Sequence, residues 1–160
     1  MGADSNIRAA EPDEATKLGI IALAAKASWG YSADQLEAWR GELTPTAGSL
    51  RLQPTFVVEV AGELAGSYQL SISGSPIELE HLWVHPKFMR QGLGRALLSH
   101  ALQYLARSGV AWLHIDADPN AAPFYVAFGA TFVREQAAPI EGQADRVRPQ
   151  FRLATGQADP

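Results

Sequence analysis

The sequence predicts a mixed α/β domain in which strands and helices alternate along the chain. Two patterns carry this prediction: short runs rich in β-branched and aromatic residues, such as 55–60, and one long amphipathic helix pattern over 93–107. The chain has 160 residues, of which 47% are hydrophobic and 19% charged. A chain of this size and composition buries a core without disulfides, so we expect a single domain over residues 1–160, with a core of about 6–153.

The N-terminal part is expected to form one strand and two helices. Residues 6–10 suit a short strand, and Pro12 suits the first turn of a helix, with acidic residues around it that complement the helix dipole. Apolar residues at helical spacing continue this helix to Ala25. Ser32 can then cap a second short helix over 33–40.

A turn and a β-hairpin should follow. Residues 44–48 have turn composition, and the β-rich run 55–60 is joined through the tight turn 61–63 to a second strand over 64–72.

The next strand, 77–84, changes phase along its length. Its apolar residues are odd-numbered before residue 80 and even-numbered after it. Because side chains alternate with period two, one extra residue near Glu80-His81, a β-bulge, would account for the change. The alternative is burial of both faces at the strand end, since Trp83 is also apolar.

The C-terminal half is expected to begin with the helix 93–107, which carries Arg107 in its last turn and Gly109 just beyond it. Asn120 is a candidate N-cap for the following helix. The expected elements are a strand over 111–117, a helix over 120–128, a strand over 130–135, and 151–153 closing the sheet at its edge.

A glycine-bearing turn, with Gly92 and Gly94, joins the strand 77–84 to the helix 93–107. Glycines at a helix start let backbone N–H groups approach a phosphate, and the helix dipole favours the negative charge. The surrounding stretch 81–115 contains four basic residues and no acidic one. A plain tight turn is the alternative, and the spacing fits neither a Walker P-loop nor a full dinucleotide fingerprint.

Several function classes are disfavoured by composition. A formal net charge of −4 argues against nucleic acid or an anionic membrane as main partner. The chain has no cysteine, which excludes disulfides, thiolate metal sites and a cysteine nucleophile. The four histidines show no ligand spacing, so no metal is expected. With neither a signal peptide nor a long apolar run, a cytoplasmic location is expected.

Three blocks in this order resemble the GNAT superfamily of acetyl-CoA-dependent N-acetyltransferases: Leu82-Trp83-Val84-His85-Pro86, the Gly92-Leu93-Gly94 turn, and Asn120-Ala121-Ala122-Pro123-Phe124-Tyr125 followed by Gly129. Residues 7–12 and the hairpin 58–66 also look like the family, so the likeness covers about 6–135. One position departs from the family pattern, since Met89 stands where Gln or Arg usually opens the turn.

The resemblance implies a mixed sheet flanked by helices and splayed between its fourth and fifth strands, with a β-bulge in the fourth strand. It implies acetyl-CoA as cofactor, its pantetheine arm inserted in the splay and its pyrophosphate held by residues 89–96. The implied cofactor-binding residues are Leu82, Trp83, Val84, Met89, Arg90, Gln91, Gly92, Leu93, Gly94, Arg95, Ala96, Asn120, Pro123 and Tyr125.

By the same resemblance, a neutral primary amine attacks the thioester directly, without an acyl-enzyme. Tyr125 matches the tyrosine that protonates the departing thiolate. Glu78 or Glu80 would be the general base, both expected on the face that Leu82 and Val84 continue, with His81 as a fallback. Each glutamate could equally be a solvated strand charge.

The acceptor, a small-molecule or peptide amine, is not specified. Trp29, Tyr31 and Trp39 would shape its pocket by resemblance, or could be core packing, and nearby carboxylates such as Asp34 would suit a cationic amine. A homodimer is possible. The alternatives are a non-catalytic acyl-CoA sensor, an acyltransferase with another donor or acceptor, and, least favoured, a dinucleotide-binding oxidoreductase.

Overall fold

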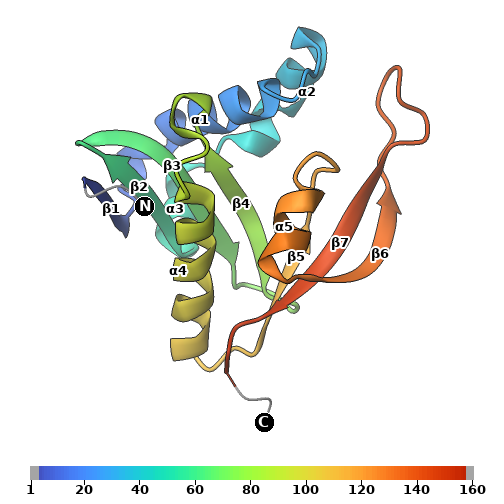
Figure 1. Cartoon of the computed structure of the whole chain (residues 1–160). Coiled ribbons are helices and arrows are strands. Elements are labelled where there is room, and N and C mark those ends of the chain that lie inside the picture. Colours follow the sequence, from blue (N-terminus) through green and yellow to red (C-terminus); the bar gives the residue numbers. More distant parts are fainter. Residues whose placement is uncertain (1–3, 158–160) are drawn as a thin grey trace.

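A computed structural model describes residues 4–157 and is built on a seven-stranded mixed sheet (Figure 1). Residues 1–3 and 158–160 of the expected domain lie outside the described residues. The sheet order is β1-β2-β3-β4-β5-β7-β6, and every neighbouring pair is antiparallel except β4 and β5, which are parallel. The strands are β1 (Ser5–Ala9), β2 (Thr55–Val60), β3 (Glu63–Ser71), β4 (Glu78–Val84), β5 (Trp112–Asp116), β6 (Thr131–Ala137) and β7 (Val147–Ala154).

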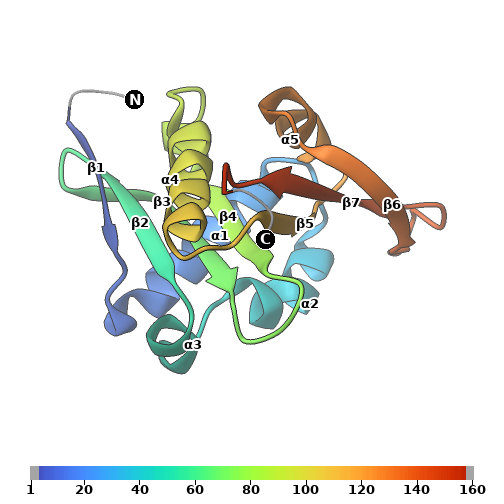
Figure 2. The same cartoon turned by 90° about the horizontal axis from the view of Figure 1, so that it is seen from below.

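Helices cover both faces of the sheet (Figure 2). One face carries α4, which packs Leu97, Leu98 and Leu105 into the main core. The other face carries α1 and α3, whose Leu18 and Leu50 form a smaller core. The helices are α1 (Ala15–Ala27), α2 (Ala33–Leu43), α3 (Ala47–Leu52), α4 (Leu93–Arg107) and α5 (Ala122–Phe128), with short 3₁₀ turns η1 (Pro12–Glu14) and η2 (Pro86–Phe88).

The β-bulge predicted in the fourth strand is confirmed. β3 pairs Gln69 with His81 but Leu70 with Leu79, so Glu80 is the extra residue on β4. The splay is also confirmed, because β4 and β5 pair only at Glu78–His114 and Leu79–Ile115 and then separate.

The expected orientation of Glu78 was wrong. The bulge keeps the apolar side chains of β4 on one face of the sheet. Leu79, Leu82 and Val84 therefore all contact the core under α4, whereas Trp83 packs against the core under α1. Glu78 is exposed on the sheet face opposite Leu79, and therefore opposite Leu82 as well.

Three other expectations differ from the structure. Residues 47–52 form a short helix instead of a turn, because Thr46 and Ser49 make a reciprocal capping box. Asn120 is not a helix N-cap, since α5 begins after Ala121 without a side-chain cap. The last strand lies between β5 and β6 and not at the sheet edge, which β6 forms.

None of the helices within residues 4–157 is both long and apolar enough to span a membrane.

Candidate active site

The turn between β4 and α4 presents free backbone donors. Arg90 and Gly92 both have positive φ values, of 65° and 78°. Gly92 stands at the N-cap position of α4 and offers no side-chain cap. The first helical hydrogen bond runs from Ala96 N to Gly92 O, so the N–H groups of residues 93–95 have no backbone acceptor within the described chain. This helix start is therefore suited to hold an anion such as a pyrophosphate.

The basic side chains near this turn differ in their availability. Lys87 is held away by Glu63, with its Nζ 3.1 Å from both carboxylate oxygens. Arg95 lies over the Phe128 ring, 5.1 Å from its centroid. Arg90 is exposed and has no side-chain partner in the described part of the chain, so its guanidinium is free to meet an anion.

Beyond the bulge, the edge of β4 that faces β5 has no strand partner in the described chain. Residues 82–84 thus present backbone groups to the opened gap, as a ligand that mimics a strand would require. β3 holds β4 closely here: a Cβ on Gly66 would lie 2.6 Å from the carbonyl oxygen of Trp83.

Tyr125 lies in α5 with only 6% of its surface exposed. Its ring packs edge-on against Phe124 at 5.2 Å and near Phe151 at 6.2 Å. Its hydroxyl has no hydrogen-bond partner within residues 4–157. Burial raises the pKa of the Tyr125 phenol, which keeps it protonated and able to donate at neutral pH.

Acidic groups collect on the open face of β4 and β5. Partial burial raises the pKa of Glu80, and the negative charges of Glu78 and Asp116 raise it further. His81 is a weaker base, because burial lowers its pKa to about 4. Its Nδ1 also lies 3.1 Å from Trp83 Nε1 and accepts that hydrogen bond. In the described chain, no group of three or more acidic or histidine side chains is placed to hold a metal ion.

A buried polar cluster around Asp118 was missed by sequence reasoning. The Asp118 carboxylate meets Lys26 Nζ at 3.0 Å and Arg146 Nη2 at 3.3 Å. It also accepts from the Tyr31 hydroxyl at 2.8 Å and from the Asn120 backbone at 2.7 Å. Burial opposes ionisation, but the hydrogen bond from Asn120 and the charge of Lys26 hold the Asp118 pKa below its ordinary value. The one local signal was the two-residue offset from Asp118 to Asn120, which suits an Asx turn.

The three aromatic residues predicted to line an acceptor pocket are not brought together as one wall. Tyr31 and Trp39 meet edge to face at 4.8 Å, whereas Trp29 packs 6.2 Å from Trp83. Lys26 Nζ lies 4.3 Å from the Trp39 ring centroid, so the protein's own cation covers that ring.

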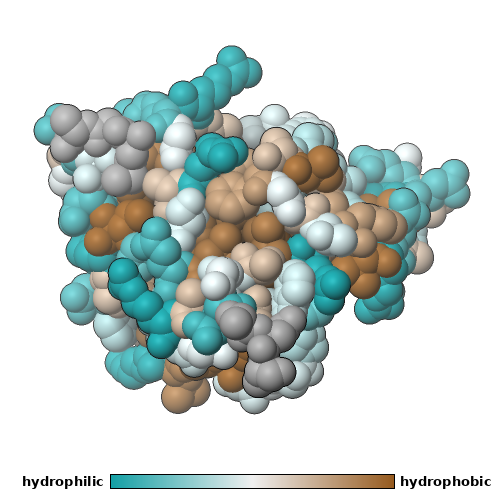
Figure 3. Space-filling model, turned by 60° about the horizontal axis from the view of Figure 1, so that its bottom comes forward, coloured by the Kyte–Doolittle hydropathy of each residue, from teal (hydrophilic) through white to brown (hydrophobic). Residues whose placement is uncertain are grey.

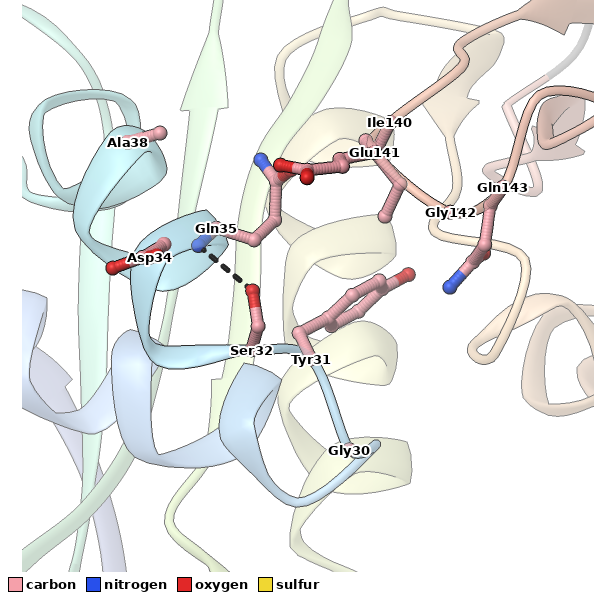
Figure 4. Close-up of a pocket in the computed structure, with 10 residues that line it drawn as sticks. All are labelled: Gly30, Tyr31, Ser32, Asp34, Gln35, Ala38, Ile140, Glu141, Gly142 and Gln143. Carbon is pink, nitrogen blue, oxygen red and sulfur yellow. Dashed lines mark hydrogen bonds between the residues drawn. The ribbon is translucent and has the colours of Figure 1, made fainter.

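A cavity of about 440 Å³ opens beside this cluster, between α2 and the loop that joins β6 to β7 (Figure 4). Tyr31 forms part of its wall, and the charged residues that line it, Asp34 and Glu141, are both acidic. Gln35 and Gln143 add amide groups from opposite sides. Glu37, another carboxylate of α2, pairs with Arg40 and does not line the cavity.

Comparison with known proteins assigns the chain to a family. The family model described as the acetyltransferase (GNAT) family matches residues 22–130. The [ribosomal protein bS18]-alanine N-acetyltransferase of Escherichia coli K12 is 39% identical over 75 residues, which are 43% of this chain and 51% of that protein. The match to these curated relatives thus spans about half of their length.

Solved structures share the fold across nearly the whole chain. A GCN5-related N-acetyltransferase from Rhodopseudomonas palustris superposes with a TM-score of 0.79 at 21% identity, covering 96% of this chain and 98% of that one. The PaiA N-acetyltransferase of Thermoplasma acidophilum, solved with coenzyme A, gives 0.77 at 16% identity, covering 96% and 99%. With the bulged and splayed sheet and the uncapped start of α4, these matches show that the chain belongs to the acetyltransferase (GNAT) family.

Proposed function

We propose that the protein is an N-acetyltransferase that transfers the acetyl group of acetyl-CoA to a primary amine by direct attack within a ternary complex. One observation carries this proposal. The β4–β5 splay opens toward the same end of β4 from which the uncapped start of α4 follows, so a strand-like arm and a pyrophosphate would both find donors there.

The donor site would be built largely from backbone. The N–H groups of residues 93–95 would bind the pyrophosphate, and the free edge of residues 82–84 would pair with the pantetheine arm. Asn120 donates its side-chain Nδ2 to Asp118 at 3.0 Å and to Tyr31 at 3.2 Å. Its side-chain carbonyl is therefore left to accept from an amide of the arm.

The chain supplies an acid and a base for the transfer. Acetyl-CoA brings an activated thioester. We assign Tyr125 as the acid that protonates the departing thiolate, because its buried phenol stays neutral. We assign Glu80 as the base that takes the amine proton, directly or through water, because its raised pKa makes it a better proton acceptor than an ordinary carboxylate. A backbone N–H of Trp83 or Val84 would stabilise the oxyanion.

The acceptor would enter through the cavity beside Tyr31. Its two charged wall residues, Asp34 and Glu141, favour an acceptor that carries positive charge, such as a polyamine or the N-terminus of a basic peptide. The curated relatives are named for acetylating an alanine of a ribosomal protein, which makes a peptide N-terminus one member of this class to test.

The test is amine-dependent release of coenzyme A thiol. Because the chain has no cysteine, a thiol reagent reports only the product. Acetyl-CoA should be consumed in the presence of at least one amine from a panel of polyamines, amino acids and N-terminal peptides. Tight binding of coenzyme A with no amine-dependent release would favour a non-catalytic acyl-CoA sensor instead.

A further inference from the structure

We propose that Asp118 is a positioning residue that joins the acceptor cavity to the donor-binding loop after β5, so that a bound donor orders the cavity wall. The inference rests on the proposed function, because it takes Asn120 as a donor contact and the cavity beside Tyr31 as the acceptor site.

The two oxygens of Asp118 divide the work between the two sites. Oδ1 faces the donor loop and accepts from the backbone N–H of Asn120 at 2.7 Å and from its side-chain Nδ2 at 3.0 Å. Oδ2 faces the acceptor side and accepts from the Tyr31 hydroxyl at 2.8 Å. One carboxylate therefore fixes both the Asn120 amide plane and the Tyr31 ring.

The Tyr31 hydroxyl makes a second, direct connection. Its oxygen accepts from Asn120 Nδ2 at 3.2 Å and from Arg146 Nη2 at 3.1 Å, while it donates to Asp118. The same side chain lines the cavity (Figure 4). A residue of the acceptor cavity is thus in hydrogen-bond contact with the residue that would hold the donor arm.

The cluster is stiff because it is buried and charged. The side chains of Asp118 and Arg146 are each 4% exposed, and that of Lys26 is 11% exposed. Arg146 is anchored further by its bond to the Ala138 carbonyl at 3.0 Å. The network therefore ties together α1, the α1–α2 connection, the loop after β5 and the segment before β7. Because fully hydrogen-bonded buried networks are rigid, a bound donor that restrains Asn120 should also restrain Tyr31.

Coupling of this kind predicts a response in the cavity before any acceptor is present. Coenzyme A alone should slow amide hydrogen exchange in a peptide covering residues 28–36, as well as at 89–96 and 118–124. The variant Tyr31→Phe removes the shared hydroxyl and keeps the ring. In it, slowing at 28–36 should disappear, and the Kd for coenzyme A should rise about 3- to 10-fold, the cost of roughly one hydrogen bond.

A matched control separates this effect from general loss of stability. Tyr68→Phe also removes a tyrosine hydroxyl, which is hydrogen-bonded to His100 Nδ1 at 2.7 Å, but Tyr68 lies outside the network. It should leave the Kd and the protection at 28–36 unchanged. Asp118→Asn is less suitable, because it leaves two buried cations without their carboxylate and so destabilises the fold itself.

The outcomes are distinct. Loss of protection at 28–36 in Tyr31→Phe but not in Tyr68→Phe supports the link. If coenzyme A protects 89–96 in the wild type but leaves 28–36 unchanged, or if both variants behave alike, the link is overturned and the proposed function stands. If the wild type does not bind coenzyme A, both are overturned.

Discussion

The Tyr31 hydroxyl lies 2.8 Å from Asp118 Oδ2, although 87 positions separate the two residues in the chain. This hydrogen bond places the connection between α1 and α2 directly over the loop that leaves β5. The α1–α2 connection and the loop after β5, the two segments that would flank the proposed reaction centre, are thereby held to each other as well as to the sheet. Apolar side chains gather near the middle of the face shown in Figure 3, with hydrophilic side chains toward its edges.

Tyr125→Phe should lower kcat about 10- to 100-fold, near the lower end of what a general acid contributes, because the departing thiolate loses its proton donor. The Kd for coenzyme A should change little, since the ring packing is kept. Initial rates of thiol release and calorimetric titration measure the two quantities. Wild-type turnover in this variant would remove Tyr125 from the mechanism.

Glu80→Gln should lower kcat/KM about 100-fold at neutral pH, because the amine loses its proton acceptor. The acid limb of the wild-type pH–rate profile should lie above the ordinary carboxyl pKa of 4.5, since the pKa of Glu80 is raised. Glu78→Gln removes one of the charges that raise it, so the limb should move to lower pH while activity persists. Profiles measured with one amine compare the variants, and an unmoved limb would exclude this assignment.

Gly66→Ala should lower the free energy of unfolding by about 1–3 kcal/mol, because the new Cβ would meet the Trp83 carbonyl oxygen at 2.6 Å. The displaced β4 should also bind coenzyme A more weakly. Gly74→Ala is the control, since a Cβ there meets nothing within 4 Å. Urea unfolding of both variants gives the comparison. Equal stability would show that β3 can shift away from β4 with no loss in the free energy of unfolding.

His81 should make the fold sensitive to acid. Burial lowers its pKa from 6.5 to about 4, so the unfolded chain takes up this proton at a higher pH than the folded chain. The contribution of neutral His81 to the free energy of unfolding, up to about 3 kcal/mol, is present above pH 6.5 and is lost as the pH falls from 6.5 to 4. His81→Asn keeps an acceptor for Trp83 and should lose less stability over this range. Urea unfolding at pH 7 and pH 4.5 measures the loss of stability in the wild type and in the variant. Equal losses in the two proteins would contradict this role of His81.

Local patterns in the sequence were sufficient to predict the features that depend on neighbouring residues. The helix Leu93–Arg107 and the bulge at Glu80 follow from the spacing of apolar side chains, and both were confirmed. The splay and the strand arrangement around it followed only from the family resemblance, and they were confirmed by the register of β4 and β5.

The features that sequence reasoning missed depend on contacts between distant residues. Lys26, Asp118 and Arg146 lie in three separate parts of the chain, and nothing in their surroundings indicates that they meet. Asn120 was expected to cap α5, because an isolated Asn before a helix favours that role. In the fold its amide is taken by Asp118 and Tyr31, which only the tertiary structure brings within reach.

The most direct test of the proposed transfer follows a labelled acetyl group by mass spectrometry. The wild type is mixed with acetyl-CoA that carries a deuterated acetyl group, with and without each amine of the panel. The label should appear on the nitrogen of an amine only when enzyme, acetyl-CoA and amine are together, and the mass of the protein should stay unchanged. If coenzyme A binds but the label reaches none of the amines, or if the protein itself becomes a labelled intermediate, direct transfer to an amine is contradicted.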